Sequence, residues 1–452
     1  MLNRRQLNKR IGGLNMRPTK RALFVSGLVA LTSLPLSACG QPGNPGDPSS
    51  VPEQSETKNS EAIDMTKFPN YVEDIENLTY SFENKQMTDP YFLGNVIYNE
   101  SAIMVKHEDG SVYANLRYKP KKVLSVRDYT WKTEYPTSSY SVQDKKIVMA
   151  EDGDIPYWTE AQLLGEGIPS PYVRRESMSL TNIATDYFVY TGMGMYTESD
   201  IYYGRQVQVS YVYDVNDLNA EANPTCLIET LPNLKAKLEA HGEVKLVTVG
   251  DSVGEGCSSS FKFNHEPYMH PWADQIADVL SEKYGAHVTN ANQSVGGKKS
   301  DYTSEDDGKL AAIAAENPDC LFIHYGINDL GSQVSPNMFK ENIERIVLYV
   351  QSNLPKCDIV LLSPIMPNPG IYDSEKMQMY GEGLAELAET YTDSSKGVAF
   401  VDMTKLSLDD LSNGKTYFDL TANGINHPND YGHRLYTQAL AAALVESSLW
   451  KK

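Results

Sequence analysis

Four short motifs in the second half of the chain contain residue types suited to nucleophilic chemistry. Ser252 comes directly after Gly250-Asp251, at the end of the apolar, β-branched run 244–249. The other three motifs are Asn292-Gln-Ser-Val-Gly-Gly297, Gly326-Ile-Asn328-Asp329 and Asn426-His427-Pro428-Asn429. A serine becomes a nucleophile when an imidazole takes its proton, and N–H donors then stabilise the oxyanion. On its own, the Gly-Asp-Ser run also fits a strand followed by an Asx turn.

In this order, the four motifs resemble the SGNH (GDSL-type) hydrolase family, over about residues 243–449. The four signature residues would be Ser252, Gly297, Asn328 and His427. The resemblance implies that Ser252 is the nucleophile and His427 the base. It also implies that the oxyanion donors are the backbone N–H groups of Ser252 and Gly297 and the side-chain amide of Asn328. It implies no metal and no organic cofactor.

The chain departs from the family pattern at the residue that orients the histidine. Family members usually have an aspartate three residues before the histidine, and that position here is Gly424, with Asn423 one residue earlier. Asn423 is therefore the candidate orienting residue, although an asparagine in that role can impose the wrong tautomer. Some carbohydrate esterases of the family use a dyad in which a backbone carbonyl orients the ring. We expect this chain to use such a Ser252–His427 dyad.

Four other histidines lie near the motifs in the sequence. His265 and His270 are one residue too far apart for an H-E-x-x-H metal motif, and a proline interrupts them, which excludes that motif. Both are candidates for lining the pocket because they follow the nucleophile loop. We expect His324 to pack within a strand and His433 to lie on a helix surface.

The motifs fall between strands and helices that alternate along the chain. The predicted strands are residues 244–249, 287–291, 320–324, 359–362 and 398–401, and the predicted helices are residues 271–284, 336–354, 374–391 and 431–447. This alternation predicts an α/β fold with a parallel sheet flanked by helices, which the resemblance specifies as flavodoxin-like. All four motifs would lie at the carboxyl ends of the strands, where sites form in such sheets.

Residues 63–226 have a different pattern, with short runs rich in tyrosine and β-branched residues separated by turns. Tyr187–Tyr190 and Gln206–Tyr213 alternate with period two, which predicts half-buried antiparallel strands. We therefore predict an all-β sandwich or jelly-roll accessory domain over 63–226. Its tyrosines could stack on sugar rings, although tyrosine is also common in ordinary strands. A helical linker, 227–242, would join it to an SGNH hydrolase domain over 243–452.

The first residues of the chain indicate export. Residues 1–38 read as a signal peptide, with a basic start and an apolar stretch of about fifteen residues, shorter than the roughly 20 that span a bilayer. Leu36-Ser-Ala-Cys39 resembles a bacterial lipoprotein box, which implies a lipid on Cys39 and anchoring at the cell surface. The alternative is a plain secretory signal. Residues 39–62 are polar and proline-rich, which predicts a flexible tether.

Charge and cysteine content narrow the classes of partner. The formal net charge of −19 disfavours nucleic acids and anionic lipids as partners. After Cys39 the remaining cysteines form no zinc or C-x-x-C spacing, and by default we expect them to be small buried residues. They are Cys226, Cys257, Cys320 and Cys357. Neither the disulfide pairing nor the oligomeric state follows from the sequence.

Taken together, these features predict a cell-surface serine esterase. The resemblance implies removal of small acyl groups, acetyl above all, from polysaccharide or oligosaccharide hydroxyls through an acyl-enzyme. One alternative is a lipase or phospholipase of the same family, which the polar loop 257–266 disfavours. A second is a non-catalytic carbohydrate-binding lipoprotein, which the presence of all four signature residues disfavours.

Overall fold

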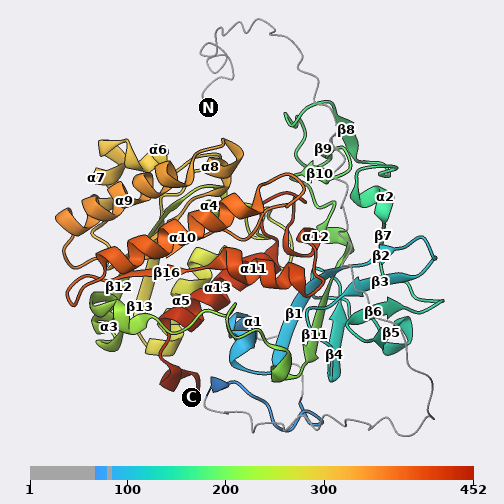
Figure 1. Cartoon of the computed structure of the whole chain (residues 1–452). Helices are drawn as coiled ribbons and strands as arrows, with labels where there is room; N and C mark the ends of the chain where they lie inside the picture. The colour runs from blue at the N-terminus through green and yellow to red at the C-terminus, as the bar shows by residue number, and fades with distance from the viewer. Residues whose placement is uncertain (1–66, 79–83, 452) are drawn as a thin grey trace, which may run out of the picture. The chain divides into compact units, whose positions relative to one another are not determined.

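A five-stranded parallel sheet forms the centre of the C-terminal half of the chain (Figure 1). The computed structural model describes residues 67–78 and 84–451. The strands are β12 (Glu243–Gly250), β13 (His287–Asn292), β14 (Cys320–His324), β15 (Asp358–Leu362) and β16 (Val398–Val401), in the order β13-β12-β14-β15-β16. Every residue of β14 and β15 is buried, as expected for parallel strands with helices on both faces.

Helices flank this sheet where the sequence predicts them. The four predicted ones are α5 (Trp272–Tyr284), α9 (Pro336–Asn353), α10 (Ser374–Tyr391) and α13 (Asp430–Leu444). Helix α5 packs against α13, and α9 against α10. The others are α3 (Pro232–Glu239), α4 (Ser252–Glu255), α6 (Asp301–Ser304), α7 (Asp307–Glu316), α8 (Ile327–Gly331), α11 (Met403–Ser412) and α12 (Tyr417–Leu420). The predicted α/β fold is thus confirmed.

The preceding region is rich in mostly antiparallel strands, as predicted, and these form three sheets. The first contains β1 (Val96–Ile103), β11 (Gln206–Val212) and β4 (Lys122–Arg127), with β11 in the middle. The second has the order β5 (Tyr140–Gln143), β6 (Lys146–Met149), β3 (Val112–Asn115), β2 (Val105–Lys106) and β7 (Trp158–Thr159). The third has the order β10 (Gly194–Thr197), β9 (Asp186–Tyr190) and β8 (Val173–Arg175). Two short helices, α1 (Asn84–Thr88) and α2 (Glu160–Leu163), accompany them.

Strand β11 is buried at every residue, so the prediction that it would be half-buried was wrong. The reason is that α12 and α13 contact the neighbouring strand β1, which brings the helical part of the chain against this sheet. Asn429, the N-cap of α13, donates to the side chain of Gln206, and Arg434 of α13 donates to the carbonyl of Tyr98. A period-two pattern therefore does not reveal that the polar face of this strand is covered.

Buried ion pairs join the β-rich region to the segment around α11. The guanidinium of Arg117 pairs with Asp409 at 2.5 Å and also with Asp410. The ammonium of Lys415 lies 2.8 Å from the carboxylate of Glu100 in β1. Removing one partner of a buried pair leaves an uncompensated charge, so each side of this network depends on the other.

One hydrophobic cluster extends from Tyr91 to Trp450 and includes side chains of both regions. The described residues accordingly belong to one compact unit. The predicted signal peptide, the tether and Cys39 lie outside the described residues. In the described part of the chain, no helix has the length and apolar character needed to span a membrane.

Candidate active site

Ser252 and His427 meet although 175 residues separate them in the chain. Ser252 is the first residue of α4 and is separated from the end of β12 by Asp251 alone, and His427 lies in the loop before α13. The Oγ atom of Ser252 lies 2.9 Å from Nε2 of His427. Ser252 is 7% exposed. An imidazole at this distance can accept the serine proton, so the arrangement is suited to nucleophilic attack.

A carboxylate that the sequence analysis missed lies on the other side of the imidazole. Oε1 of Glu198 is 3.1 Å from Nδ1 of His427, and both side chains are mostly buried, at 16% and 13% exposure. Glu198 directly follows β10 in the β-rich region. No motif surrounds Glu198, and it lies outside the range of the family resemblance, so no local signal identifies it. The expectation of a dyad with a backbone carbonyl was therefore wrong.

The two ionisable groups of this contact shift each other's pKa. Burial tends to lower the pKa of His427, but the nearby carboxylates, Glu198 first among them, raise it more strongly, so the net pKa is raised. Burial tends to raise the pKa of Glu198, but His427 and hydrogen bonds from Tyr196 and Asn423 lower it more. Both shifts favour a charged pair, as expected for an imidazolium beside a carboxylate.

Asn423 contacts the backbone around His427 rather than its ring. Its Oδ1 accepts hydrogen bonds from the backbone N–H groups of Ile425, Asn426 and His427, at 2.9–3.0 Å. Its Nδ2 lies 3.4 Å from Oε1 of Glu198. Asn423 thus shapes the histidine loop and contacts the carboxylate, whereas the group that faces Nδ1 of the ring is Glu198 and not Asn423, the residue predicted from the sequence.

Of the two remaining signature residues, Gly297 lies in the loop after β13, next to Gly296, and Asn328 lies in the first turn of α8. Gly296 packs next to the nucleophile, since a Cβ added to it would lie 3.7 Å from Cβ of Ser252. The N–H of Gly296 donates to the carboxylate of Glu255 at 2.8 Å. Gly297 follows, with open space where its side chain would be. The side-chain Nδ2 of Asn328 donates to the carbonyl of Lys298 at 3.1 Å. Because an amide nitrogen has two hydrogens, one remains for an oxyanion.

Hydrogen bonds from Ser300 to Asp329, at the start of α8, hold the glycine loop in place. The carboxylate of Asp329 accepts hydrogen bonds from both the N–H and the hydroxyl of Ser300, and Asn342 donates to the same hydroxyl. Burial raises the pKa of Asp329 to about 6, although the bonds from Ser300 act to lower it. Asn328 and the loop it touches are therefore held in one fixed arrangement.

The glycines that follow the nucleophile serve packing inside the protein. An added Cβ at Gly256, which has a φ of +90°, would lie 2.4 Å from Pro271, and one at Gly254 would lie 2.7 Å from the hydroxyl of Ser294. The nucleophile turn is thus pressed against the loops around it, and no side chain fits at either glycine without displacing them.

The other histidines have structural contacts. His324 is buried and its Nε2 lies 3.0 Å from the hydroxyl of Tyr436, which confirms that it packs locally. His433 is fully buried and bonds to the carbonyl of Cys257, so its predicted surface position was wrong. Burial lowers the pKa of His433 to about 4, which keeps it neutral. It is buried because its side of α13 lies against the segment that follows the nucleophile turn, where Cys257 is.

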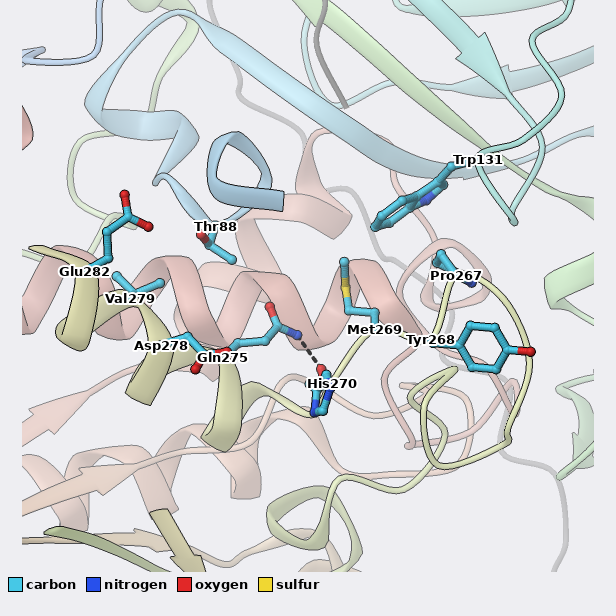
Figure 2. A pocket seen from close by; sticks show the side chains of 10 residues that line it. All are labelled: Thr88, Trp131, Pro267, Tyr268, Met269, His270, Gln275, Asp278, Val279 and Glu282. Carbon is cyan, nitrogen blue, oxygen red and sulfur yellow. Dashed lines mark hydrogen bonds between the residues drawn. The ribbon is translucent and has the colours of Figure 1, made fainter. Parts of the chain in front are cut away.

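Figure 2 shows a separate cavity of about 170 Å³ between α1, the loop before α5 and α5 itself. Its lining residues are Thr88, Trp131, Pro267, Tyr268, Met269, His270, Gln275, Asp278, Val279 and Glu282, which include neither Ser252 nor His427. His270 therefore lines this cavity, and its ring also stacks on Phe261. The ring of His265 packs among Tyr203, Tyr129 and Phe263 instead.

The cysteines and acidic residues offer no metal centre in the part of the chain that is described. Over 67–78 and 84–451, no group of three or more His, Cys, Asp or Glu side chains is placed to hold a metal ion. The four cysteines in this part are unpaired, with Cys320 and Cys357 buried, Cys257 partly exposed and Cys226 exposed. The default expectation that all four are buried was therefore wrong for Cys226.

Comparison with known proteins matches residues 248–435 to the GDSL-like Lipase/Acylhydrolase family. No curated protein matches. Among solved structures, a two-domain esterase active on acetylated mannans, co-crystallized with mannopentaose, is 20% identical, with a TM-score of 0.39. That alignment covers 49% of this chain and 54% of the other, so this chain spans about half the length of that relative.

Two further structures align over 44% of this chain and 94% of their own. An acetylxylan esterase from Geobacillus stearothermophilus is 19% identical with a TM-score of 0.36, and a carbohydrate esterase family 3 protein from Talaromyces cellulolyticus is 12% identical with a TM-score of 0.35. The family match includes Ser252, Gly297, Asn328 and His427 and excludes Glu198. The segment 248–435 thus has the sequence pattern of the GDSL-like lipase/acylhydrolase family.

Proposed function

We propose that this protein is a serine esterase that removes small acyl groups, acetyl above all, from polysaccharide or oligosaccharide hydroxyls. The observation that carries the proposal is the 2.9 Å contact between Oγ of Ser252 and Nε2 of His427. Ser252 attacks the ester carbonyl while His427 takes its proton and then passes it to the departing sugar oxygen, which leaves as a hydroxyl group when its bond to the acyl carbon breaks. Water, activated by the same imidazole, hydrolyses the acyl-enzyme.

The oxyanion of each tetrahedral intermediate is assigned to the backbone N–H groups of Ser252 and Gly297 and to the side-chain amide of Asn328. The fastened loop described above supports this assignment, because donors that are already in place need no reorganisation during the reaction. Open space beside Gly297 leaves room for a substrate. This suits an ester carried on a bulky polymer better than one that must enter a closed tunnel.

The proposed substrate class is sugar esters rather than lipids. The loop 257–266, which follows the nucleophile, is largely polar, whereas a lipase needs an extensive apolar surface around its serine. The net charge of −19 also works against binding to anionic membranes. Phe261, at 45% exposure, is the one strongly exposed apolar side chain of this loop in the described structure.

The first experiment is hydrolysis of p-nitrophenyl acetate by the wild-type protein and by Ser252→Ala. The proposal expects turnover that depends on Ser252. Acetate release from acetylated xylan, mannan, pectin and peptidoglycan then identifies the sugar, with p-nitrophenyl esters of longer acyl chains measured in parallel. A clear preference for long acyl chains would replace the carbohydrate esterase with a lipase, and no turnover on any ester would replace it with a binding protein.

We further propose that the protein is exported and held at the bacterial cell surface by a lipid on Cys39. The support is the order of a basic segment, an apolar stretch and Leu36-Ser-Ala-Cys39 in the sequence. Two acyl chains on one residue give stable anchoring where one chain gives only marginal binding. Cys39→Ala should move the protein out of the membrane fraction, and an unchanged distribution would contradict the anchor.

A further inference from the structure

We propose that Glu198 is the positioning carboxylate for His427, so that the β-rich region completes the active site. This inference rests on the proposed esterase function and deepens it. It gives a role in the active site to a part of the chain that lies outside the matched family segment. From the sequence alone, this part is predicted to be an accessory domain.

The geometry gives the two ring nitrogens of His427 different tasks. Nδ1 faces Glu198 at 3.1 Å and Nε2 faces Ser252 at 2.9 Å. A carboxylate only accepts hydrogen bonds, so it selects the tautomer with a proton on Nδ1 and leaves the lone pair of Nε2 free to receive the serine proton. Once His427 is protonated, the same carboxylate stabilises the imidazolium.

Position 424, where the family pattern expects the acid, is sterically closed in this protein. Gly424 has a φ of +74°, and an added Cβ would lie 2.5 Å from the hydroxyl of Tyr202 and 2.6 Å from the carbonyl oxygen of Met195. Tyr202 is fully buried and donates to that same carbonyl. No aspartate fits at position 424 without displacing this pair, whatever its rotamer.

The residues that close position 424 belong to the segment that supplies the replacement acid. Met195 lies in β10, and Glu198 follows three residues later, directly after the strand ends. Asn368 bonds to the carbonyls of Met193 and Gly424, at 2.9 and 3.3 Å, which ties the strand pair β9–β10 to the histidine loop. The residues that close position 424 and the carboxylate that faces His427 thus come from one short segment, residues 195–202.

The carboxylate of Glu198 is held from three further sides. Tyr196 bonds to it from β10, Asn423 from the histidine loop, and the hydroxyl of Ser258 lies 3.4 Å from Oε2. Because these groups bond mainly to the ionised form, the carboxylate stays charged and correctly oriented.

A pH profile separates this role from a merely structural one. His427 is faced by Glu198, by Asp251 and Glu255 of the nucleophile turn, and by the neutral His433 of α13. Hydrolysis needs the neutral imidazole, so activity falls when the pH drops below the raised pKa of His427. Removing the charge of Glu198 lowers that pKa, and the acidic limb of the profile of kcat/KM then moves to lower pH.

The test compares Glu198→Gln, Glu198→Asp and Glu198→Ala in the full chain, with p-nitrophenyl acetate as the substrate. Glu198→Gln should lower kcat by at least about a hundredfold, and up to about 10⁴-fold if it imposes the wrong tautomer, with little change in KM. Its acidic limb should move to lower pH, and Glu198→Asp should recover part of the lost activity. Glu176→Gln, the same change at an exposed site in the same region, should leave activity unchanged.

A double variant tests the closed position directly. Adding Gly424→Asp to Glu198→Ala should not restore activity, because the new side chain meets Tyr202 and Met195. Recovery of turnover in the double variant would overturn the steric argument. Normal kcat in Glu198→Gln, or a loss without movement of the acidic limb, would overturn the positioning role. Wild-type protein without Ser252-dependent turnover would instead overturn the proposed function, so the two failures are distinguishable.

Discussion

The turn that holds Ser252 and the strand pair that holds Glu198 place their side chains by different physical means. The nucleophile turn is local: β12 ends, Asp251 caps α4 through the N–H of Val253, and the turn packs on neighbouring loops. Glu198 depends on contacts between distant segments, such as those of Asn368 with Met193 and Gly424. The first kind of placement leaves a motif in the sequence, and the second leaves none.

The largest expected effect is on turnover and tests Ser252, which the local nucleophile turn positions. Ser252→Ala removes the nucleophile and leaves the turn intact, since the side chain of Asp251 and not that of Ser252 caps α4. The turnover of p-nitrophenyl acetate should fall by about 10⁴-fold or more. Thermal unfolding should be nearly unchanged. Residual turnover within tenfold of the wild type would show that another group attacks the ester.

The next effect tests the contacts between the regions. Arg117→Met leaves Asp409 and Asp410 buried without their cation, which should lower the free energy of unfolding by about 3–5 kcal/mol. Urea unfolding followed by tryptophan fluorescence should show one transition at a lower midpoint, since both regions share a core. Arg174→Met, at an exposed position, should stay within about 0.5 kcal/mol of the wild type. Two separate transitions would mean that the regions fold independently.

Asn328→Ala tests one of the proposed oxyanion donors, a residue that its sequence motif identified. Loss of one such donor should lower kcat by about 10²–10³-fold, with KM largely unchanged. Steady-state kinetics on p-nitrophenyl acetate give both constants. A change confined to KM would place Asn328 in substrate binding instead.

The smallest effect concerns the support of Glu198. Asn423→Asp keeps the acceptor for the three backbone N–H groups and adds a negative charge near the carboxylate and His427. The added charge should raise the pKa of His427 further, which moves the acidic limb of kcat/KM to higher pH by about one unit. The kcat at the plateau should remain within about tenfold of the wild type. An unmoved limb would show that Asn423 is electrostatically remote from the imidazole.

Much of the hydrolase fold could be predicted because its information is local. Helix α10 and strand β14 have the same bounds as the predicted helix 374–391 and the predicted strand 320–324. This was possible because apolar runs and helix caps are properties of neighbouring residues in the sequence. Ser252 and His427 were placed by their motifs. What the sequence hid is pairing across long separations: the burial of β11 under α13, and the contact of Glu198 with a histidine 229 residues later.

Helix α13 covers a sheet whose first strand is synthesised long before the helix itself. All of its fifteen residues are buried, and its arginine Arg434 reaches the carbonyls of Tyr98 and Asn99 in β1, the first strand of the described chain. The ribosome completes β1 more than three hundred residues before α13, so one face of the β sheet remains exposed in the nascent chain. Until synthesis ends, that face is exposed to holding chaperones and proteases, and a chain that stops short of α13 should be degraded rather than accumulate.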